Sequence, residues 1–172
     1  MRNYLIEGIS GSGKSTVGDE LLRRGYKVVE ADWEPGLSQW VEKETGHPAK
    51  HEPPFSEEWL AKHIWVWNEE KLNQMLDEEQ DGIQFLVGGA DNMEKFFSKF
   101  TKRFFLYVDN ELMKRRLQNR EPERWPDESA ELRRMTEWNN GLLSNPPKNV
   151  ILIEGSQPVN KIADIILGEV NE

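Results

Sequence analysis

The stretch Gly8-Ile-Ser-Gly-Ser-Gly-Lys-Ser-Thr16 decides the fold that this sequence predicts. A short apolar run at residues 4–6 precedes it, as at the end of a strand, and a helix-like run at residues 17–24 follows it. The glycines let the backbone curl so that successive N–H groups point inward, and the following helix adds the positive end of its dipole. A strand, loop and helix of this kind form a cradle for phosphate groups.

The loop matches the pattern G-x-x-x-x-G-K-[ST] in full, which is the signature of a P-loop. In this pattern Lys14 reaches the β- and γ-phosphates of a nucleoside triphosphate, and the hydroxyl of Ser15 ligates Mg²⁺. We therefore expect ATP and Mg²⁺ as cofactors, with Lys14 also acting in catalysis. The residues of the loop expected to bind the nucleotide are Gly8, Ser10, Gly11, Ser12, Gly13, Lys14, Ser15 and Thr16.

The composition limits the partners that the protein can have. The 172 residues include 22 Lys and Arg against 31 Asp and Glu, a net charge of -9. Such a surface repels nucleic acid and anionic membranes, so we expect neither as a partner. The absence of cysteine excludes disulfides and thiolate metal sites and is compatible with a reducing cytosol. With no signal peptide or membrane-length apolar run visible, we expect a cytoplasmic monomer or homodimer that acts on a small molecule.

Short apolar runs alternate with longer amphipathic runs along the whole chain. Strands joined by helices indicate an α/β fold, a parallel sheet covered on both faces, within one domain over residues 1–172. The strands are expected at residues 3–7, 27–31, 83–87, 104–108 and 150–153. The helices are expected at residues 15–24, 56–79, 92–100, 111–120, 127–143 and 158–170.

Two polar segments interrupt this alternation, at residues 33–54 and 119–128. Both are rich in proline and charge, and both are expected as loops over one edge of the sheet. Ligands of open parallel sheets bind beyond the carboxyl ends of the strands, where long loops are often functional. We therefore interpret residues 33–80 as an insertion that binds the phosphate acceptor and residues 119–128 as a short lid.

Two carboxylates follow the second expected strand. Glu30 and Asp32 are two residues apart on an extended chain, so both can point to the same side. We expect Glu30 to support the magnesium shell and Asp32 to orient or deprotonate an acceptor hydroxyl. The alternative is that both are solvated loop acids without a role.

Nearly the whole chain resembles the small P-loop kinases, the group that holds nucleoside monophosphate, shikimate and gluconate kinases. Two acids separated by one residue after the second strand are typical of shikimate kinases, as is a glycine run after the third, which Gly88 and Gly89 resemble although the run is one glycine shorter. The resemblance implies a five-stranded parallel sheet ordered 2-3-1-4-5 and flanked by helices. It also implies transfer of the γ-phosphate of ATP to a small molecule, with Gly88 and Gly89 touching that substrate.

The arginines extend the resemblance. Residues 112–126, LMKRRLQNREPERWP, are similar to the helix that enters the lid of adenylate kinase-like enzymes. By this resemblance Arg116 lies against the adenine, while Arg120, Arg124 and Arg134 stabilise the transferred phosphoryl group. The loop after the last strand implies a nucleotide contact from Gln157. The alternative for Arg116, Arg120 and Arg134 is a solvated helix face paired with neighbouring glutamates.

The expected insertion is rich in aromatic residues. Trp33, Trp40, His63 and Trp67 are candidates to bind the acceptor, because aromatic walls suit a flat or apolar molecule. The alternative is that these tryptophans fill the core. On the expected helix, Leu60, Ile64 and Trp67 follow core spacing, and Trp59 and His63 share a face.

Departures from the family pattern narrow the range of possible phosphate acceptors. The D-G-x-P-R signature of monophosphate kinases is absent, since residues 88–92 read GGADN and Asn92 stands where an arginine grips a phosphate. The carboxylate-binding arginines typical of shikimate kinases are not evident after the second strand. A neutral, hydroxyl-bearing acceptor is therefore favoured. The alternatives are a nucleoside or nucleoside monophosphate kinase, and, from another class, a P-loop ATPase or nucleotide-sensing module.

Overall fold

A computed structural model describes residues 2–51, 53–77 and 82–171 of the chain. Its main sheet has five parallel strands in the order β2-β6-β1-β7-β8. Counted along the chain, these are the second, third, first, fourth and fifth parallel strands, so the predicted order 2-3-1-4-5 is confirmed. The strands are β1 (Arg2–Gly8), β2 (Lys27–Glu30), β6 (Ile83–Val87), β7 (Lys102–Tyr107) and β8 (Ile151–Glu154).

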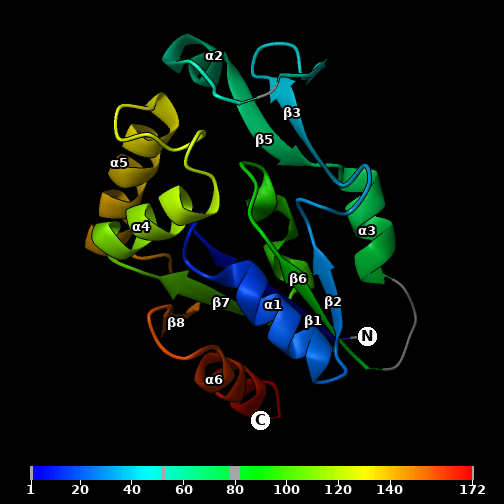
Figure 1. Cartoon of the computed structure of the whole chain (residues 1–172). Helices are drawn as coiled ribbons and strands as arrows, with labels where there is room; N and C mark the ends of the chain where they lie inside the picture. The colour runs from blue at the N-terminus through cyan, green and yellow to red at the C-terminus, as the bar shows by residue number, and fades with distance from the viewer. Residues whose placement is uncertain (1, 52, 78–81, 172) are drawn as a thin grey trace.

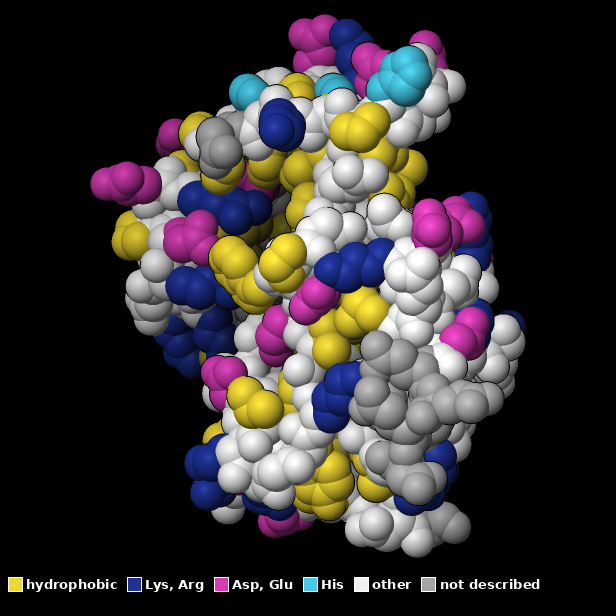
Figure 2. Space-filling model, turned by 90° about the vertical axis from the view of Figure 1, so that its right-hand side faces the viewer, with side chains coloured by type: hydrophobic (Ala, Val, Ile, Leu, Met, Phe, Trp, Pro, Cys, Tyr) yellow, Lys and Arg dark blue, Asp and Glu magenta, His cyan; other side chains and the backbone are white. Residues whose placement is uncertain are grey.

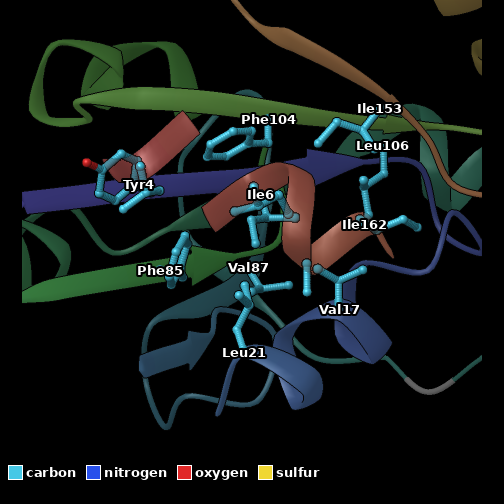
Figure 3. Close-up of a cluster of buried hydrophobic side chains, with 13 residues drawn as sticks. Tyr4, Ile6, Val17, Leu21, Phe85, Val87, Phe104, Leu106, Ile153 and Ile162 are labelled. Atoms are coloured by element: carbon cyan, nitrogen blue, oxygen red, sulfur yellow. The ribbon is translucent and has the colours of Figure 1, made fainter. Parts of the chain in front are cut away.

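One face of the sheet is covered by α1 (Lys14–Arg23) and α6 (Val159–Asn171), as Figure 1 shows. Side chains alternate between the faces of a strand, so Tyr4 and Ile6 of β1 point to this side. They meet Val17 and Leu21 of α1 and Ile162 of α6 in the cluster drawn in Figure 3. This core fixes the start of α1, and therefore the loop before it, at the carboxyl end of β1.

The opposite face carries a second core. It is formed by α3 (Glu69–Asp77) and the 3-10 helix η1 (Met93–Lys99), whose apolar residues include Leu72 and Phe96. Leu5 of β1 points to this side, whereas its neighbours Tyr4 and Ile6 point to the face covered by α1 and α6. Both faces are thus buried, as a parallel sheet requires.

A third core lies beside the main sheet, between α4 (Asn110–Arg120) and α5 (Ala130–Ser144). Asp109 and Ser129 cap the two helices by accepting hydrogen bonds from Leu112 N and Leu132 N. The connection between the helices is the segment predicted as the lid. Trp125 anchors it, because its side chain is buried against α4 and α5.

The predicted helix at residues 56–79 is wrong. The structure has α2 (Glu57–Lys62), then strand β5 (His63–Trp67), then α3. Residues 78–79 of the prediction lie outside the described residues. The predicted loop at residues 33–54 contains β3 (Ser38–Glu42) and β4 (Pro48–Ala49), which join β5 in a three-stranded antiparallel sheet ordered β4-β3-β5. The aromatic and β-branched run HIWVW prefers an extended backbone once β3 offers it a pairing partner.

This change moves one predicted acceptor residue into the core. Trp67 ends β5 and is 1% exposed, packed with Leu72 and Phe96 on the second face of the main sheet. The side chain is therefore part of the packing between the two sheets, as in the alternative that these tryptophans fill the core, and its contact with an acceptor stays a prediction. No helix within the described residues has the length and apolar character needed to cross a membrane.

Replacing Phe85 tests the central core. Its ring is fully buried on β6, so Phe85→Ala should lower the free energy of unfolding by about 3–5 kcal/mol. The exposed Leu22 of α1 offers the matched control, and Leu22→Ala should change it by less than about 0.5 kcal/mol. Urea unfolding followed by circular dichroism measures both. Equal losses for the two variants would contradict the packing described.

Candidate nucleotide and acceptor site

The glycine-rich loop follows β1 directly and ends where α1 begins at Lys14. Gly13 is the N-terminal cap of α1 and takes a left-handed backbone with φ of 103°, which glycine adopts without strain. The Lys14 ammonium donates to Ile9 O at 3.0 Å across the loop, and the Ser12 hydroxyl is buried without a hydrogen-bond partner. A curled backbone, a helix N-terminus and an unpaired buried hydroxyl together suit a bound phosphate.

Lys14 is the point where the predicted catalytic groups meet. Burial lowers the pKa of this ammonium to about 8, because water no longer solvates the charge. The negative charges of Asp32 and Glu30 favour the ammonium and raise its pKa, whereas the positive charge of Arg120 lowers it further. Four predicted site residues, from the loop, the end of β2 and the end of α4, therefore lie within electrostatic reach of one another.

Glu30 lies against the start of α1. Ser15 Oγ donates to its Oε2 at 3.1 Å, while Oε1 is buried without a partner. Burial raises the pKa of the Glu30 carboxyl, and the Ser15 hydrogen bond and the charge of Lys14 oppose that rise. Gly18 makes room for it, since a Cβ there would lie 2.5 Å from Oε1. A larger residue at position 18 would displace the carboxylate.

The donors at this point fit a magnesium ion. The Ser15 hydroxyl and the incompletely bonded Glu30 carboxylate are hard oxygen ligands, which Mg²⁺ prefers. Across residues 2–51, 53–77 and 82–171 no three metal-ligating side chains are grouped. That suits Mg²⁺ bound to a nucleotide, which takes one or two protein ligands and completes its shell with phosphates and water.

Arg116 braces the back of the loop. From α4 its guanidinium donates to Gly11 O at 3.2 Å, Ser12 O at 3.1 Å and Gly155 O at 2.9 Å. It thus joins the glycine-rich loop to the loop after β8, as expected of a residue at the base of the nucleotide site. Gln157 lies in that second loop, where its side chain donates to Glu154 O at 3.4 Å. Their nucleotide contacts stay predictions.

The remaining arginines connect the lid to the antiparallel sheet. Arg124 pairs with the buried Glu131 at 2.9 Å, and its guanidinium lies over the ring of Phe55, 5.9 Å from the centroid. Arg134 donates to Leu60 O of α2 at 2.8 Å. The charge of Arg120, by contrast, lowers the pKa of Lys14, and its guanidinium pairs with the adjacent Glu121. Of these three arginines, Arg120 is the one whose charge acts on Lys14 of the phosphate loop, and the transfer roles of all three stay predictions.

An aromatic cluster fills one face of the antiparallel sheet. Trp40 of β3 contacts Trp65 of β5 at 5.4 Å and Trp59 of α2 at 4.9 Å between ring centroids. Trp59 stacks on His63 at 4.0 Å and on Phe55 at 4.6 Å. Two of the predicted acceptor residues, Trp40 and His63, belong to this cluster. Trp33 stands apart from it and is 80% exposed directly after Asp32.

The cluster includes residues that the sequence interpretation did not assign to the site. Trp65, Phe55 and His51 belong to it, and Trp65 Nε1 donates to Asp32 Oδ1 at 3.0 Å. Alternation along HIWVW was the signal available, because it places residues 63, 65 and 67 on one side of a strand. A helical spacing fits the same residues, so the sequence analysis assigned this segment to a helix instead of a strand.

The other face of this sheet is different in character. It carries Val41, Ile64 and Val66, which line an open hollow of about 660 Å³ with polar residues of η1. In Figure 2 hydrophobic side chains gather at the height of this sheet, below a rim of histidine and charged side chains. The hollow includes neither the glycine-rich loop nor Asp32. It is therefore separate from the phosphate site.

The segment after β6 joins the two sheets. Gly88 N donates to Ile6 O at 3.1 Å, and Gly88 approaches Ala31 so closely that a Cβ would lie 2.9 Å from the Ala31 Cβ. The side chain of Asn92 accepts from Trp67 N and donates to Trp67 O, both at 2.9 Å. Asn92 therefore holds the end of β5 at the position where monophosphate kinases carry an arginine. The substrate contacts of Gly88 and Gly89 stay predictions.

Comparison with known proteins agrees with this geometry. The family model described as AAA domain matches residues 5–139, which is most of the chain, and the chain belongs to that family. No curated protein sequence matches it.

The solved structures that share the fold include several kinases. A deoxyadenosine kinase from M. mycoides with bound dATP has a TM-score of 0.61 at 13% identity, covering 100% of both chains. A shikimate kinase from Aquifex aeolicus has 0.56 at 22%, covering 99% of this chain and 96% of that one. A gluconokinase from Sinorhizobium meliloti has 0.54 at 17%, covering 97% and 90%. At these identities the likeness shows a shared fold.

The lowered pKa of Lys14 predicts a proton-linked nucleotide affinity. The free ammonium loses its proton as pH rises through about 8, whereas bound phosphate favours the charged form and raises the pKa. ATP binding should therefore take up protons between about pH 7.5 and pH 9, and affinity should fall across that window. Calorimetry in two buffers of different ionisation enthalpy measures the uptake.

The variant Lys14→Arg is the control, because arginine keeps its charge throughout this range. Its proton uptake should vanish even where its affinity is reduced. Uptake that is unchanged in Lys14→Arg would assign the effect to another group.

Proposed function

We propose that the protein is a phosphotransferase that moves the γ-phosphate of ATP to a hydroxyl of a small molecule. The observation that supports this proposal is that the carboxylate of Asp32, two residues beyond the end of β2, acts electrostatically on the ammonium of the P-loop lysine, at the common carboxyl edge of the parallel sheet. A group that holds the transferring phosphate and a group able to orient its acceptor are thereby placed together. The kinase fold of the solved neighbours supports the same activity.

The residues divide the reaction among them. The backbone of the loop and Lys14 hold the phosphates, and Arg116 braces the loop from behind. Asp32 accepts the proton of the acceptor hydroxyl while the acceptor oxygen bonds to the γ-phosphorus and the bond from that phosphorus to the bridging oxygen of ADP breaks. The proton then passes from Asp32 to water. The products are ADP, a phosphate monoester and one proton.

Magnesium belongs to this proposal. Ser15 and Glu30 would hold it, and when bound it neutralises charge on the phosphates of the nucleotide. Arg120 adds positive charge at the same point, since it already acts on Lys14. Arg124 and Arg134 would reach the phosphoryl group from the lid, which excludes water from the reaction.

The acceptor is proposed to be a hydroxyl compound rather than a monophosphate. Asn92 is engaged by both backbone groups of Trp67, so this position offers no cation for a second phosphate. A net charge of -9 also disfavours nucleic acid as a partner. With no cysteine to require an oxidising compartment, we propose that the protein works in the cytoplasm as a monomer or homodimer.

The direct test is release of ADP from Mg·ATP with and without a panel of acceptors: nucleosides, nucleoside monophosphates, sugar acids and hydroxylated antibiotics. One acceptor should accelerate ADP release and appear as a product heavier by one phosphoryl group. Equal ADP release in every well, with inorganic phosphate as the sole other product, would instead identify an ATPase or nucleotide-sensing module.

The variant Asp32→Asn separates binding from transfer. It removes the proton acceptor without removing a phosphate contact, so transfer should fall by about 10²–10⁴-fold while the Kd for ATP changes little. Glu34→Gln is the matched control, since Glu34 lies two residues further on and pairs with Lys71 instead. Acceptor-dependent ADP release and ATP titration give the two readouts. Intact turnover in Asp32→Asn would remove this residue from the mechanism.

The variant Gly18→Ala tests whether the position of the Glu30 carboxylate matters for magnesium binding. The added methyl would meet Oε1, move the carboxylate away from Ser15 and raise the Mg²⁺ concentration needed for half-maximal activity by about tenfold. Gly168→Ala on α6 is the control, because a Cβ there meets open space. Magnesium titration at saturating ATP measures the effect. The proposed metal contact fails if both variants keep the wild-type magnesium requirement.

A further inference from the structure

Asp32 is held by a residue from the antiparallel sheet. Trp65 Nε1 donates to Asp32 Oδ1 at 3.0 Å, across 33 residues of sequence. The second carboxylate oxygen, Oδ2, makes no hydrogen bond to any of the described residues. One oxygen of the proposed proton acceptor is therefore fixed, and the other is left for a ligand.

Trp65 is itself fixed from two sides. Its backbone N donates to Asp91 Oδ2 at 2.8 Å, and its carbonyl accepts from Asp91 N at 2.7 Å. Its ring meets Trp40 edge to face, and Trp40 meets Trp59 in the same way. Asp91 follows β6 of the main sheet, so the indole is anchored to both sheets. A donor held this firmly can set the direction of the carboxylate that it contacts.

The surroundings of Asp32 are aromatic. Trp65 contacts its carboxylate, and Trp33 follows it in the chain with an 80% exposed indole that makes no ring contact with any of the described residues. One exposed and one half-buried indole beside a polar group are suited to a flat ligand that also carries a hydroxyl.

The arginines of the lid and of α5 that contact Phe55 and α2 are already engaged. Arg124 pairs with Glu131 and Arg133 with Glu57, while Arg134 donates to a carbonyl of α2. An acidic acceptor would need one of these pairs to break before its carboxylate found a partner. An uncharged acceptor meets no such cost.

We propose that Trp65 is the positioning residue of the acceptor site: its N–H orients Asp32 toward the acceptor hydroxyl, and its ring, with that of Trp33, selects an uncharged alcohol that carries a flat ring. This inference rests on the proposed phosphotransferase function. The proton of the acceptor hydroxyl passes to the free oxygen of Asp32 as that hydroxyl oxygen bonds to the γ-phosphorus and ADP leaves. Nucleosides are the available probes of this class, and gluconate and shikimate are the acidic probes of similar size.

The first arm of the experiment compares acceptors with the wild-type protein. Adenosine, guanosine, thymidine and deoxycytidine are assayed against gluconate and shikimate, with product mass as the readout. At least one nucleoside should gain a phosphoryl group at a kcat/KM about tenfold or more above either acid. Preferred transfer to an acid would overturn the inference and leave the phosphotransferase function standing. Transfer to neither class would overturn the inference as well.

The second arm compares Trp65→Phe with Trp59→Phe, using the best acceptor from the first. Trp65→Phe keeps a ring but loses the N–H, so kcat for transfer should fall by about tenfold to a hundredfold. Its Kd for ATP should not change, because Trp65 makes no contact with the glycine-rich loop among the described residues. Trp59→Phe also removes an indole from the cluster, but this indole makes no contact with Asp32, and its kcat should stay near that of the wild type.

Comparison of kcat for transfer, the Kd for ATP and thermal stability shows whether Trp65 positions Asp32 or only stabilises the fold. A purely structural role for Trp65 would lower thermal stability, ATP affinity and transfer together, and Trp59→Phe would behave in the same way. A loss confined to kcat for transfer supports positioning of Asp32. Unchanged transfer in Trp65→Phe would overturn it. Loss of ADP release in every variant and with every acceptor would point instead to failure of the proposed function.

Discussion

The charge of Lys14 is the constraint on which the rest of the site depends. The ammonium lies at the start of α1, where burial lowers its pKa and the carboxylates of Glu30 and Asp32 counter that effect. Those carboxylates can do so because β2 runs parallel to β6 in the same sheet and ends at the same edge as β1. A parallel sheet gathers the ends of its strands, so three groups distant in sequence share one electrostatic environment.

The second requirement is that the antiparallel sheet, where we propose that the acceptor binds, stays in register with the phosphate loop. Asp91 and Asn92 provide this by binding the backbone of β5 with their side chains, much as a neighbouring strand would. Because both residues follow β6, the antiparallel sheet is fixed to the strand that lies between β1 and β2. Trp65 completes the connection by contacting Asp32. Phosphate donor and acceptor groups are thus positioned by one continuous framework of hydrogen bonds.

The lid is attached to this framework more loosely. Arg124 of the lid contacts Phe55 with a half-exposed guanidinium, Arg134 of the following helix α5 contacts α2, and the ion pair between Arg133 of α5 and Glu57 lies at the surface. Exposed ion pairs contribute little stability, about 0–1 kcal/mol. An element held in this way can move when a nucleotide binds, which is what transfer roles for Arg124 and Arg134 would require.

The sequence was sufficient for the parts of the structure that depend on local rules. The loop at residues 8–16 has an obligatory pattern, alternating strands and helices indicate a parallel sheet, and the resemblance to small kinases implies its strand order. Glu30 and Asp32 follow the second parallel strand and both act on the charge of Lys14, because parallel strands end at a common edge, while their predicted roles stay predictions. Each of these inferences uses information contained within one or two elements.

The antiparallel sheet and its contacts could not be predicted in the same way. Residues 60, 64 and 67 fit a helix, and the same run fits a strand, so only pairing with β3 decides between them. The burial of Trp67 and the contact of Trp65 with Asp32 both follow from that pairing. The contact of Arg134 with Leu60 O joins α5 to α2 across 74 residues. No local pattern encodes such contacts.

The measurement that tests the account most directly follows the phosphate itself. The protein is incubated with Mg·ATP carrying ¹⁸O in the γ-phosphate, in ordinary water and with the acceptor panel, and the products are identified by mass. The account predicts that the labelled phosphoryl group appears on the hydroxyl of an organic acceptor, with ADP formed in equal amount. Label recovered as inorganic phosphate alone, at the same rate with every acceptor, would contradict it.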